Sequence, residues 1–185
     1  PYGNTKYIIE RILKDVAKFD KKWNISIARY FNPISNHYTG LIKENPKGIP
    51  NNLLPFIIKV AQKKLPLLYV FGKNYKTKDG TCVRDYIHVS DLAEIHIKLL
   101  KKIKKNKQSI ILNCGYGKGY SVEEIVQIFK KIKKNVKILY SDRRKGDVAQ
   151  IYSNTKKIGK YLNWKPKFDN IKKILTSAIN WEKKL

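Results

Sequence analysis

Segments with helical spacing of apolar residues alternate along this chain with short runs of strand-forming residues, and this alternation restricts the possible folds most. In segment 5–19 the apolar residues recur at the spacing of a helix packed on one face: Ile8, Ile9, Ile12, Leu13 and Val16. Residues 24–30 alternate as a strand does, and we expect this strand to stop at Asn32–Pro33, because proline lacks a backbone donor. Strands alternating with helices predict a layered α/β fold.

Residues that favour the N-cap position indicate where the remaining helices begin. The expected caps are Asn51 or Asn52, Ser90, Ser121, Thr155 and Asp169. Ser121 and Glu124 have the spacing of a capping box, which opens a helix over 122–134. The helices at the first two caps run to about residues 61 and 104. Further strands are expected at 68–71, 85–89, 109–113 and 136–140, and a long irregular loop, typical of a functional segment, at 35–50.

The composition indicates one globular domain, because 185 residues with 42% hydrophobic content suffice for a single core. Cys82 and Cys114 lack the spacing of a zinc site or a disulfide framework, so we expect no metal and a reducing, cytoplasmic setting. No apolar run approaches the roughly 20 residues that span a bilayer, and the first residues do not resemble a signal peptide. We therefore expect a soluble protein without a membrane partner.

The net charge of +26 raises the alternative of a lysine-rich nucleic-acid-binding module. Only five of the 40 basic residues are arginines, the side chain favoured for reading bases, and the lysines are spread along most segments. We therefore expect no specific nucleic-acid partner, although weak and salt-sensitive attraction to polyanions remains an expectation.

Tyr2 and Lys6 stand four residues apart at the start of the first helix, which places both side chains on one face. A lysine ammonium beside a phenol favours the phenolate, which makes a tyrosine usable as a base near neutral pH. A Tyr-x-x-x-Lys pair also occurs often by chance, so the pair needs support from other segments.

That support comes from several segments that resemble the extended short-chain dehydrogenase/reductase family, and among its members most closely the UDP-glucose 4-epimerases. Residues 1–6, PYGNTK, resemble the active-site segment, and residues 29–33, RYFNP, resemble the nicotinamide-contacting turn. Residues 48–53, GIPNNL, and 79–89, DGTCVRDYIHV, are similar to the uridine-binding segments. The resemblance runs in order from Pro1 to Trp181, and so covers nearly the whole chain.

The resemblance implies NAD as cofactor, a UDP-hexose as substrate, and interconversion of UDP-galactose and UDP-glucose at C4. Tyr2 would act as the base, Lys6 would keep it ionised and hold the nicotinamide ribose, and Tyr30 would help to position the cofactor. Substrate would be bound by Asn32, Asn52, Leu53, Phe71, Arg84, Tyr86, Arg144 and Asp147. The residue types agree, because a pyrophosphate favours fixed guanidinium groups and a uracil favours aromatic faces. His88, in an apolar stretch, is expected to be an interior histidine.

The resemblance also predicts the domain organisation: residues 1–185 are the C-terminal part of an NAD-binding Rossmann-type enzyme, with the end of that domain and an interleaved UDP-sugar-binding α/β subdomain. The Gly-rich turn that opens the family's nucleotide-binding half does not occur here, nor does the upstream Ser or Thr that assists the tyrosine. The expected partners are therefore a missing N-terminal segment of the same protein and a second copy in a homodimer. Alone, the chain is expected to be inactive and to expose apolar edges.

Two positions, and one alternative within the same family, concern substrate specificity. Ile151 stands where the size of the residue is associated in this family with acceptance of N-acetylated sugars, and its intermediate size leaves that acceptance open. Asn154 replaces a usual Asp, which predicts a local capping change. Another nucleotide-sugar epimerase, decarboxylase or dehydratase of the same family shares the Tyr-x-x-x-Lys pair, and the uridine-binding segments favour the 4-epimerase over these.

Overall fold

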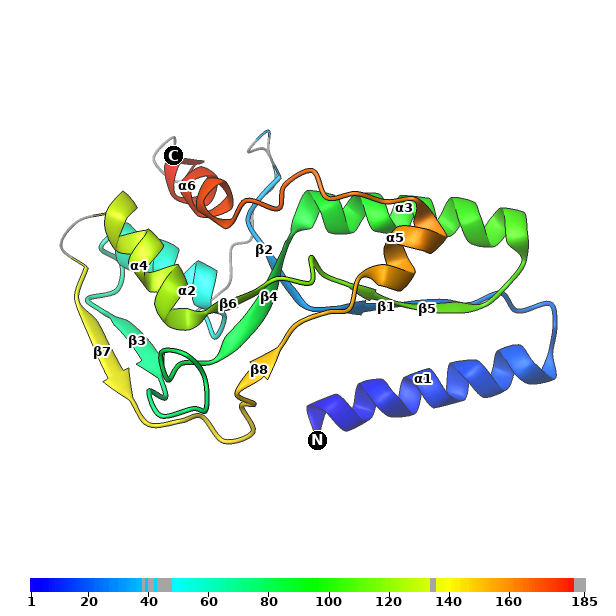
Figure 1. Ribbon diagram of the computed structural model, residues 1–185, viewed down its shortest axis with the longest axis horizontal. Helices are drawn as coiled ribbons and strands as arrows, with labels where there is room; N and C mark the ends of the chain where they lie inside the picture. The colour runs from blue at the N-terminus through cyan, green and yellow to red at the C-terminus, as the bar shows by residue number, and fades with distance from the viewer. Residues whose placement is uncertain (38, 40–41, 43–47, 134–135, 182–185) are drawn as a thin grey trace.

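A computed structural model describes the chain except residues 38, 40–41, 43–47, 134–135 and 182–185 (Figure 1). Within the described residues it is a mixed α/β fold, as the alternation of elements predicts. The helices are α1 (Tyr2–Phe19), α2 (Leu53–Ala61), α3 (Val89–Asn106), α4 (Val122–Ile132), α5 (Lys156–Leu162) and α6 (Ile171–Trp181). The strands are β1 (Ser26–Tyr30), β2 (Asn32–Ile34), β3 (Leu68–Phe71), β4 (Val83–His88), β5 (Ile110–Cys114), β6 (Gly119–Ser121), β7 (Ile138–Ser141) and β8 (Gln150–Ile151).

The elements form two lobes joined by a small sheet around β4 (Figure 1). In the first lobe β1 and β5 pair in parallel, with α1 along one side of the pair and α3 along the other. In the second lobe β3 and β7 pair in parallel and lie near α2, α4 and α6. The joining sheet has the order β2-β4-β6, with β8 also paired with β4. Strand β4 thus connects the lobes.

The first lobe runs directly into the joining sheet from β1 to β2, which are separated only by Phe31. Strand β1 pairs with β5, whereas β2 pairs in parallel with β4. The strand predicted over 24–30 does stop before Asn32–Pro33, because β1 ends at Tyr30, but both residues then lie in a second short strand, β2, which was not predicted. Strand β2 is at the edge of its sheet within the described residues, a position where proline is tolerated.

The caps confirm part of the prediction and correct part of it. Ser121 and Glu124 form the complete capping box of α4, and Asn52 and Thr155 occupy the N-cap positions of α2 and α5 without a side-chain cap bond. Asn154 accepts a hydrogen bond from the Lys156 amide at 3.1 Å, in agreement with a local capping role.

The expected caps Ser90 and Asp169 are wrong. The N-cap of α3 is His88, whose side chain accepts a hydrogen bond from the Ser90 amide, because β4 runs directly into the helix. Asp169 forms an ion pair with Lys118 at 2.7 Å. Asn170 instead accepts a hydrogen bond from the Lys173 amide near the start of α6.

The core is built from the apolar faces of the helices in the second lobe and of α3, packed on the strands. It includes fully buried Ile57, Val70, Ile95 and Phe129. Helix α1 has no buried residue. Two of its apolar side chains, Ile8 and Ile12, are each 55% exposed. Among the described strands β1 pairs only with β5, so one edge of β1 and one face of α1 are uncovered.

Part of the expected loop at 35–50, and the last predicted residue of the helix over 122–134, lie outside the described residues. The residues of the loop that are described, 35–37, 39, 42 and 48–50, form no helix or strand. In the part of the chain that the structure describes, no helix is long and apolar enough to cross a membrane.

Candidate active site

The main candidate site is a cavity of about 430 Å³ between β2, β3 and β4, the start of α2 and the segment between β7 and β8. All eight residues predicted to bind substrate line it: Asn32, Asn52, Leu53, Phe71, Arg84, Tyr86, Arg144 and Asp147. These residues come from five separate parts of the sequence, and the fold brings them together around one cavity.

Strand β4 supplies one wall of the cavity because the side chains of a strand alternate between its faces. Arg84 and Tyr86 line the cavity, whereas Asp85, between them, is fully buried elsewhere. Asn32 of β2 is the register partner of Tyr86 and lines the cavity with it. The β2–β4 pairing therefore fixes how these side chains stand relative to each other.

Arg84 is held in place on this wall. One terminal nitrogen donates hydrogen bonds to the carbonyl oxygens of Val83 and Val148, each at 2.9 Å. The other lies 3.5 Å from Asp147. The Arg84 side chain is only 16% exposed, so little rotamer freedom remains to be lost when an anion binds.

Arg144 provides the second guanidinium from the segment between β7 and β8. It lies over the Phe71 ring, 3.9 Å from the ring centroid, and donates a hydrogen bond of 3.2 Å to the Asn51 carbonyl oxygen. This geometry leaves a delocalised cation next to an aromatic face. Two arginines with aromatic neighbours suit a ligand that combines phosphate charge with a planar ring.

Tyr86 contributes a neutral hydroxyl to the cavity. Burial raises the pKa of its phenol above the ordinary value, so the group stays protonated across the physiological range. It lines the cavity as a hydrogen-bond donor or acceptor and not as a charge.

Tyr2 and Lys6 lie on one face of α1, as predicted, with the Lys6 Nζ 4.9 Å from the centroid of the Tyr2 ring. Tyr2 is 77% exposed, and neither residue lines the cavity. The described chain therefore places a paired phenol and ammonium on the uncovered side of α1, open to a ligand or to further protein.

Tyr30 also lies outside the cavity. Its hydroxyl is 2.5 Å from His96 Nε2, and the two rings meet edge to face. The next residue, Phe31, lines the cavity instead. One step along an extended chain reverses the direction of the side chain, so Phe31 and Tyr30, which is predicted to contact the cofactor, lie on different faces.

Several further residues line the cavity without having been predicted, among them Phe31, Phe56, Lys59 and Tyr69. Helical spacing from Asn52 is a signal that would have found Phe56 and Lys59, since positions four and seven further along share its face. Tyr69 lies two residues before Phe71 on β3, and the two rings are stacked. Strand alternation would have found it.

His88 lies in the interior, as expected, and it stacks on Phe168 with ring centroids 4.5 Å apart. Burial lowers the pKa of its imidazole, which favours the neutral ring. Cys82 and Cys114 are both free and buried. Within the described ranges, no three His, Cys, Asp or Glu side chains gather as metal ligands do.

Comparison with known proteins gives consistent matches. The model of the family described as "NAD dependent epimerase/dehydratase family" matches residues 1–115. The UDP-glucose 4-epimerase of Pasteurella multocida (strain Pm70) is 47% identical over 100% of this chain and 54% of that protein. The enzyme of Bacillus subtilis (strain 168) is 44% identical over 98% of this chain and 54% of its own length. The chain thus spans about half the length of these relatives.

Solved structures give the same picture. The crystal structure of UDP-glucose 4-epimerase from Bifidobacterium longum in complex with NAD+ and UDP superposes with a TM-score of 0.93 at 42% identity. The match covers 100% of this chain and 55% of that one. The expected resemblance and fold class are therefore confirmed.

Proposed function

The chain belongs to the NAD dependent epimerase/dehydratase family, and from this premise we propose that it is the substrate-binding and catalytic part of a UDP-glucose 4-epimerase. The complete enzyme interconverts UDP-galactose and UDP-glucose with NAD as cofactor. One observation carries the proposal: the eight residues that the resemblance assigns to substrate binding all line a single cavity.

The chemistry of the cavity supports a nucleoside diphosphate as ligand. Arg84 and Arg144 offer two guanidinium groups to the pyrophosphate, and both are already oriented by protein contacts. Phe71 and Tyr86 flank the uracil and the ribose. Asn32, Asn52, Leu53 and Asp147 provide the remaining polar and apolar contacts to the UDP-sugar.

In the reaction, Tyr2 takes the proton of the C4 hydroxyl as the phenolate base. Lys6, whose ammonium lies over the Tyr2 ring, holds the nicotinamide ribose. Bound NAD would supply the hydride chemistry at C4. Tyr2 then gives the proton back, so that only the configuration at C4 changes. Tyr30 stays a predicted contact of the cofactor.

We propose that the remaining part of a longer protein covers α1 and the open edge of β1. This rests on two observations: α1 has no buried residue, and the relatives are about twice as long as this chain. An N-terminal segment would supply the Gly-rich NAD-binding turn, and without it the chain would be inactive. A homodimer of the complete enzyme belongs to the same proposal.

The binding of UDP by the complete protein tests this function against the nucleic-acid alternative. Titration calorimetry with UDP, and separately with a DNA duplex, is run at about 50 and 200 mM salt. We expect UDP to bind with one site per chain, and DNA binding to be weak and to fall by about 10³-fold or more between the two salt concentrations. Binding of DNA with sequence preference, together with no binding of UDP, would contradict the proposal.

A further inference from the structure

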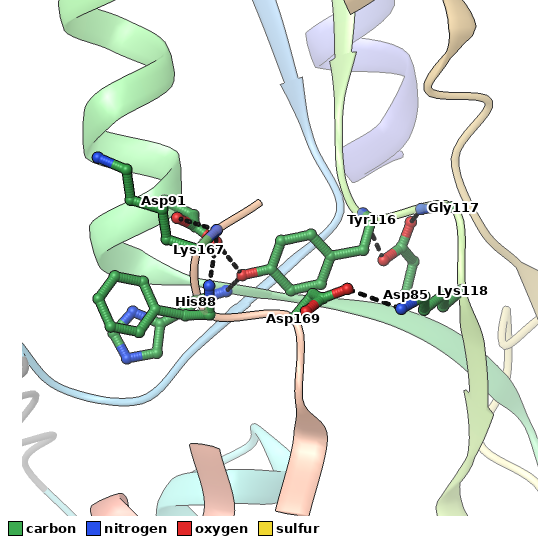
Figure 2. A network of polar contacts seen from close by, with 9 residues as sticks. Asp85, His88, Asp91, Tyr116, Gly117, Lys118, Lys167 and Asp169 are labelled. Atoms are coloured by element: carbon green, nitrogen blue, oxygen red, sulfur yellow. Dashed lines mark hydrogen bonds and ion pairs between the residues drawn. The ribbon is translucent and has the colours of Figure 1, made fainter. Parts of the chain in front are cut away.

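A buried carboxylate lies directly behind the cavity wall. Asp85, between Arg84 and Tyr86 on β4, is fully buried and accepts hydrogen bonds from two other parts of the chain. Figure 2 shows Asp85 beside the first of them, Tyr116 and Gly117. Its Oδ1 accepts from the amide of Tyr116 at 2.9 Å, and its Oδ2 accepts from the amide of Gly117 at 2.9 Å. Both donors precede β6, which pairs with β4 on one side.

The other donor to Asp85 is Ser153, which follows β8. Its amide and its hydroxyl both donate to Oδ2, at 3.0 and 2.6 Å. The Gly117 amide also donates to the Ser153 oxygen, at 3.0 Å. A side chain at Gly115 would collide with both Asp85 and Ser153, so this contact requires a glycine there. The bond between Asp85 and Ser153 thus belongs to a tightly packed site.

The segment before Ser153, residues 141–152, is held from the surface by polar contacts, such as those of Arg143 with Asn74 and of Arg84 with Val148. Residues 141–152 contain no buried residue, and β8 pairs with β4 over only two residues. This segment carries Arg144 and Asp147 into the cavity. Ser153 is the first buried residue after this segment. Its bond to Asp85 therefore anchors the C-terminal end of the segment to the strand that carries Arg84.

We propose that Asp85 and Ser153 are positioning residues for the nucleotide pocket, an inference that rests on the proposed function. By holding the end of segment 141–152 against the back of β4, they fix Arg144 and Asp147 at the distance from Arg84 that a pyrophosphate requires. Neither residue lines the cavity, so both act only through the arginines.

Ser153→Ala in the complete protein tests this, because it removes the hydroxyl donor and leaves the backbone bond in place. We expect the affinity for UDP to fall by about three- to tenfold, the worth of one buried hydrogen bond. We also expect the KM for UDP-galactose to rise while kcat stays within about twofold. Hydrogen exchange of segment 141–152 should become faster.

Asp91→Asn is the matched control. Asp91 is an equally buried carboxylate of the same network, and it accepts bonds from the Tyr116 hydroxyl and from the amides of Lys167 and Phe168 (Figure 2). These hydrogen bonds do not reach segment 141–152. The control is expected to lower stability while UDP affinity stays within about twofold.

The outcomes separate the two proposals. If the unchanged protein binds UDP and Ser153→Ala binds it equally well, the positioning role is wrong and the proposed function stands. Equal loss of affinity in Ser153→Ala and Asp91→Asn would also overturn it, because the effect would then be general destabilisation. Absence of UDP binding in the unchanged protein would overturn the proposed function, and this inference with it.

Discussion

The choice between arginine and lysine is the most informative feature at the scale of single residues. The chain has only five arginines among 40 basic residues, yet two of them, Arg84 and Arg144, line the cavity. A guanidinium matches two phosphate oxygens at once, whereas an ammonium is a point charge. The use of arginine inside the cavity therefore indicates that the ligand requires the planar geometry of a guanidinium as well as its charge.

Replacement of Arg144 by lysine tests this. We expect Arg144→Lys to weaken UDP binding by about tenfold, because the charge is kept and the planar contact with Phe71 is lost. Arg143→Lys is the control, since Arg143 lies over Tyr75 and outside the cavity. Calorimetry with UDP on both variants gives the answer, and equal affinities would contradict the role of Arg144.

The predicted substrate residues could be located from sequence because they lie within recognisable segments. Strand alternation then explains why Arg84 and Tyr86 share a face. The cavity contact of Phe31 could not be predicted, because this residue lies at the turn from β1 to β2, where the chain changes partner strands. The cavity contacts of Phe56 and Lys59 could be predicted only by knowing that the face of α2 bearing Asn52 points to the cavity.

At the scale of elements, one ion pair holds α1 to the fold. Arg29 of β1 donates two hydrogen bonds of 2.6 Å to the two carboxylate oxygens of Glu10 on α1. Since α1 has no buried residue, this two-pronged contact helps to set where Tyr2 and Lys6 stand. The sequence alone gave no sign of the pair, because Glu10 and Arg29 are far apart along the chain.

The pair predicts a pH dependence of stability. The hydrogen bond from Arg29 lowers the pKa of Glu10 below its unfolded value of about 4.3. The contribution is therefore present above about pH 4.3 and is lost as the pH falls through the folded pKa. Glu10→Gln should cost about 0.5 to 1 kcal/mol at pH 7, since Arg29 is half exposed, and less below about pH 4.

Urea unfolding of the complete protein at several pH values measures this difference. Asp15→Asn, on an exposed part of the same helix, controls for the loss of one negative charge. A cost for Glu10→Gln that does not change with pH would show that the ion pair is not its source.

Elements encoded by neighbouring residues were the predictable part of the fold. The prediction for β3 matches at both ends, and the capping box of α4 forms as expected, because both depend on neighbouring residues. Strands β6 and β8 have three and two residues and exist through pairing with β4, so they leave no periodicity to detect. The start of α3 was misplaced because β4 continues into it without a turn.

At the scale of the whole molecule, the proposed site is divided. The cavity for the nucleotide lies between the elements around β4, whereas Tyr2 and Lys6 lie on α1, along the open side of the first lobe (Figure 1). The same lobe carries exposed Ile8 and Ile12 and the unpaired edge of β1. A further part of the protein that covers this side would enclose the base together with the cofactor.

The most direct test of the account is the interconversion of UDP-galactose and UDP-glucose by the complete protein and its Tyr2→Phe variant. The variant keeps the ring beneath Lys6 and loses only the hydroxyl. We expect turnover to fall by about 10²-fold or more, the usual worth of a positioned base, with UDP affinity unchanged. Unchanged turnover in Tyr2→Phe, or no epimerisation by the unchanged protein, would contradict the account.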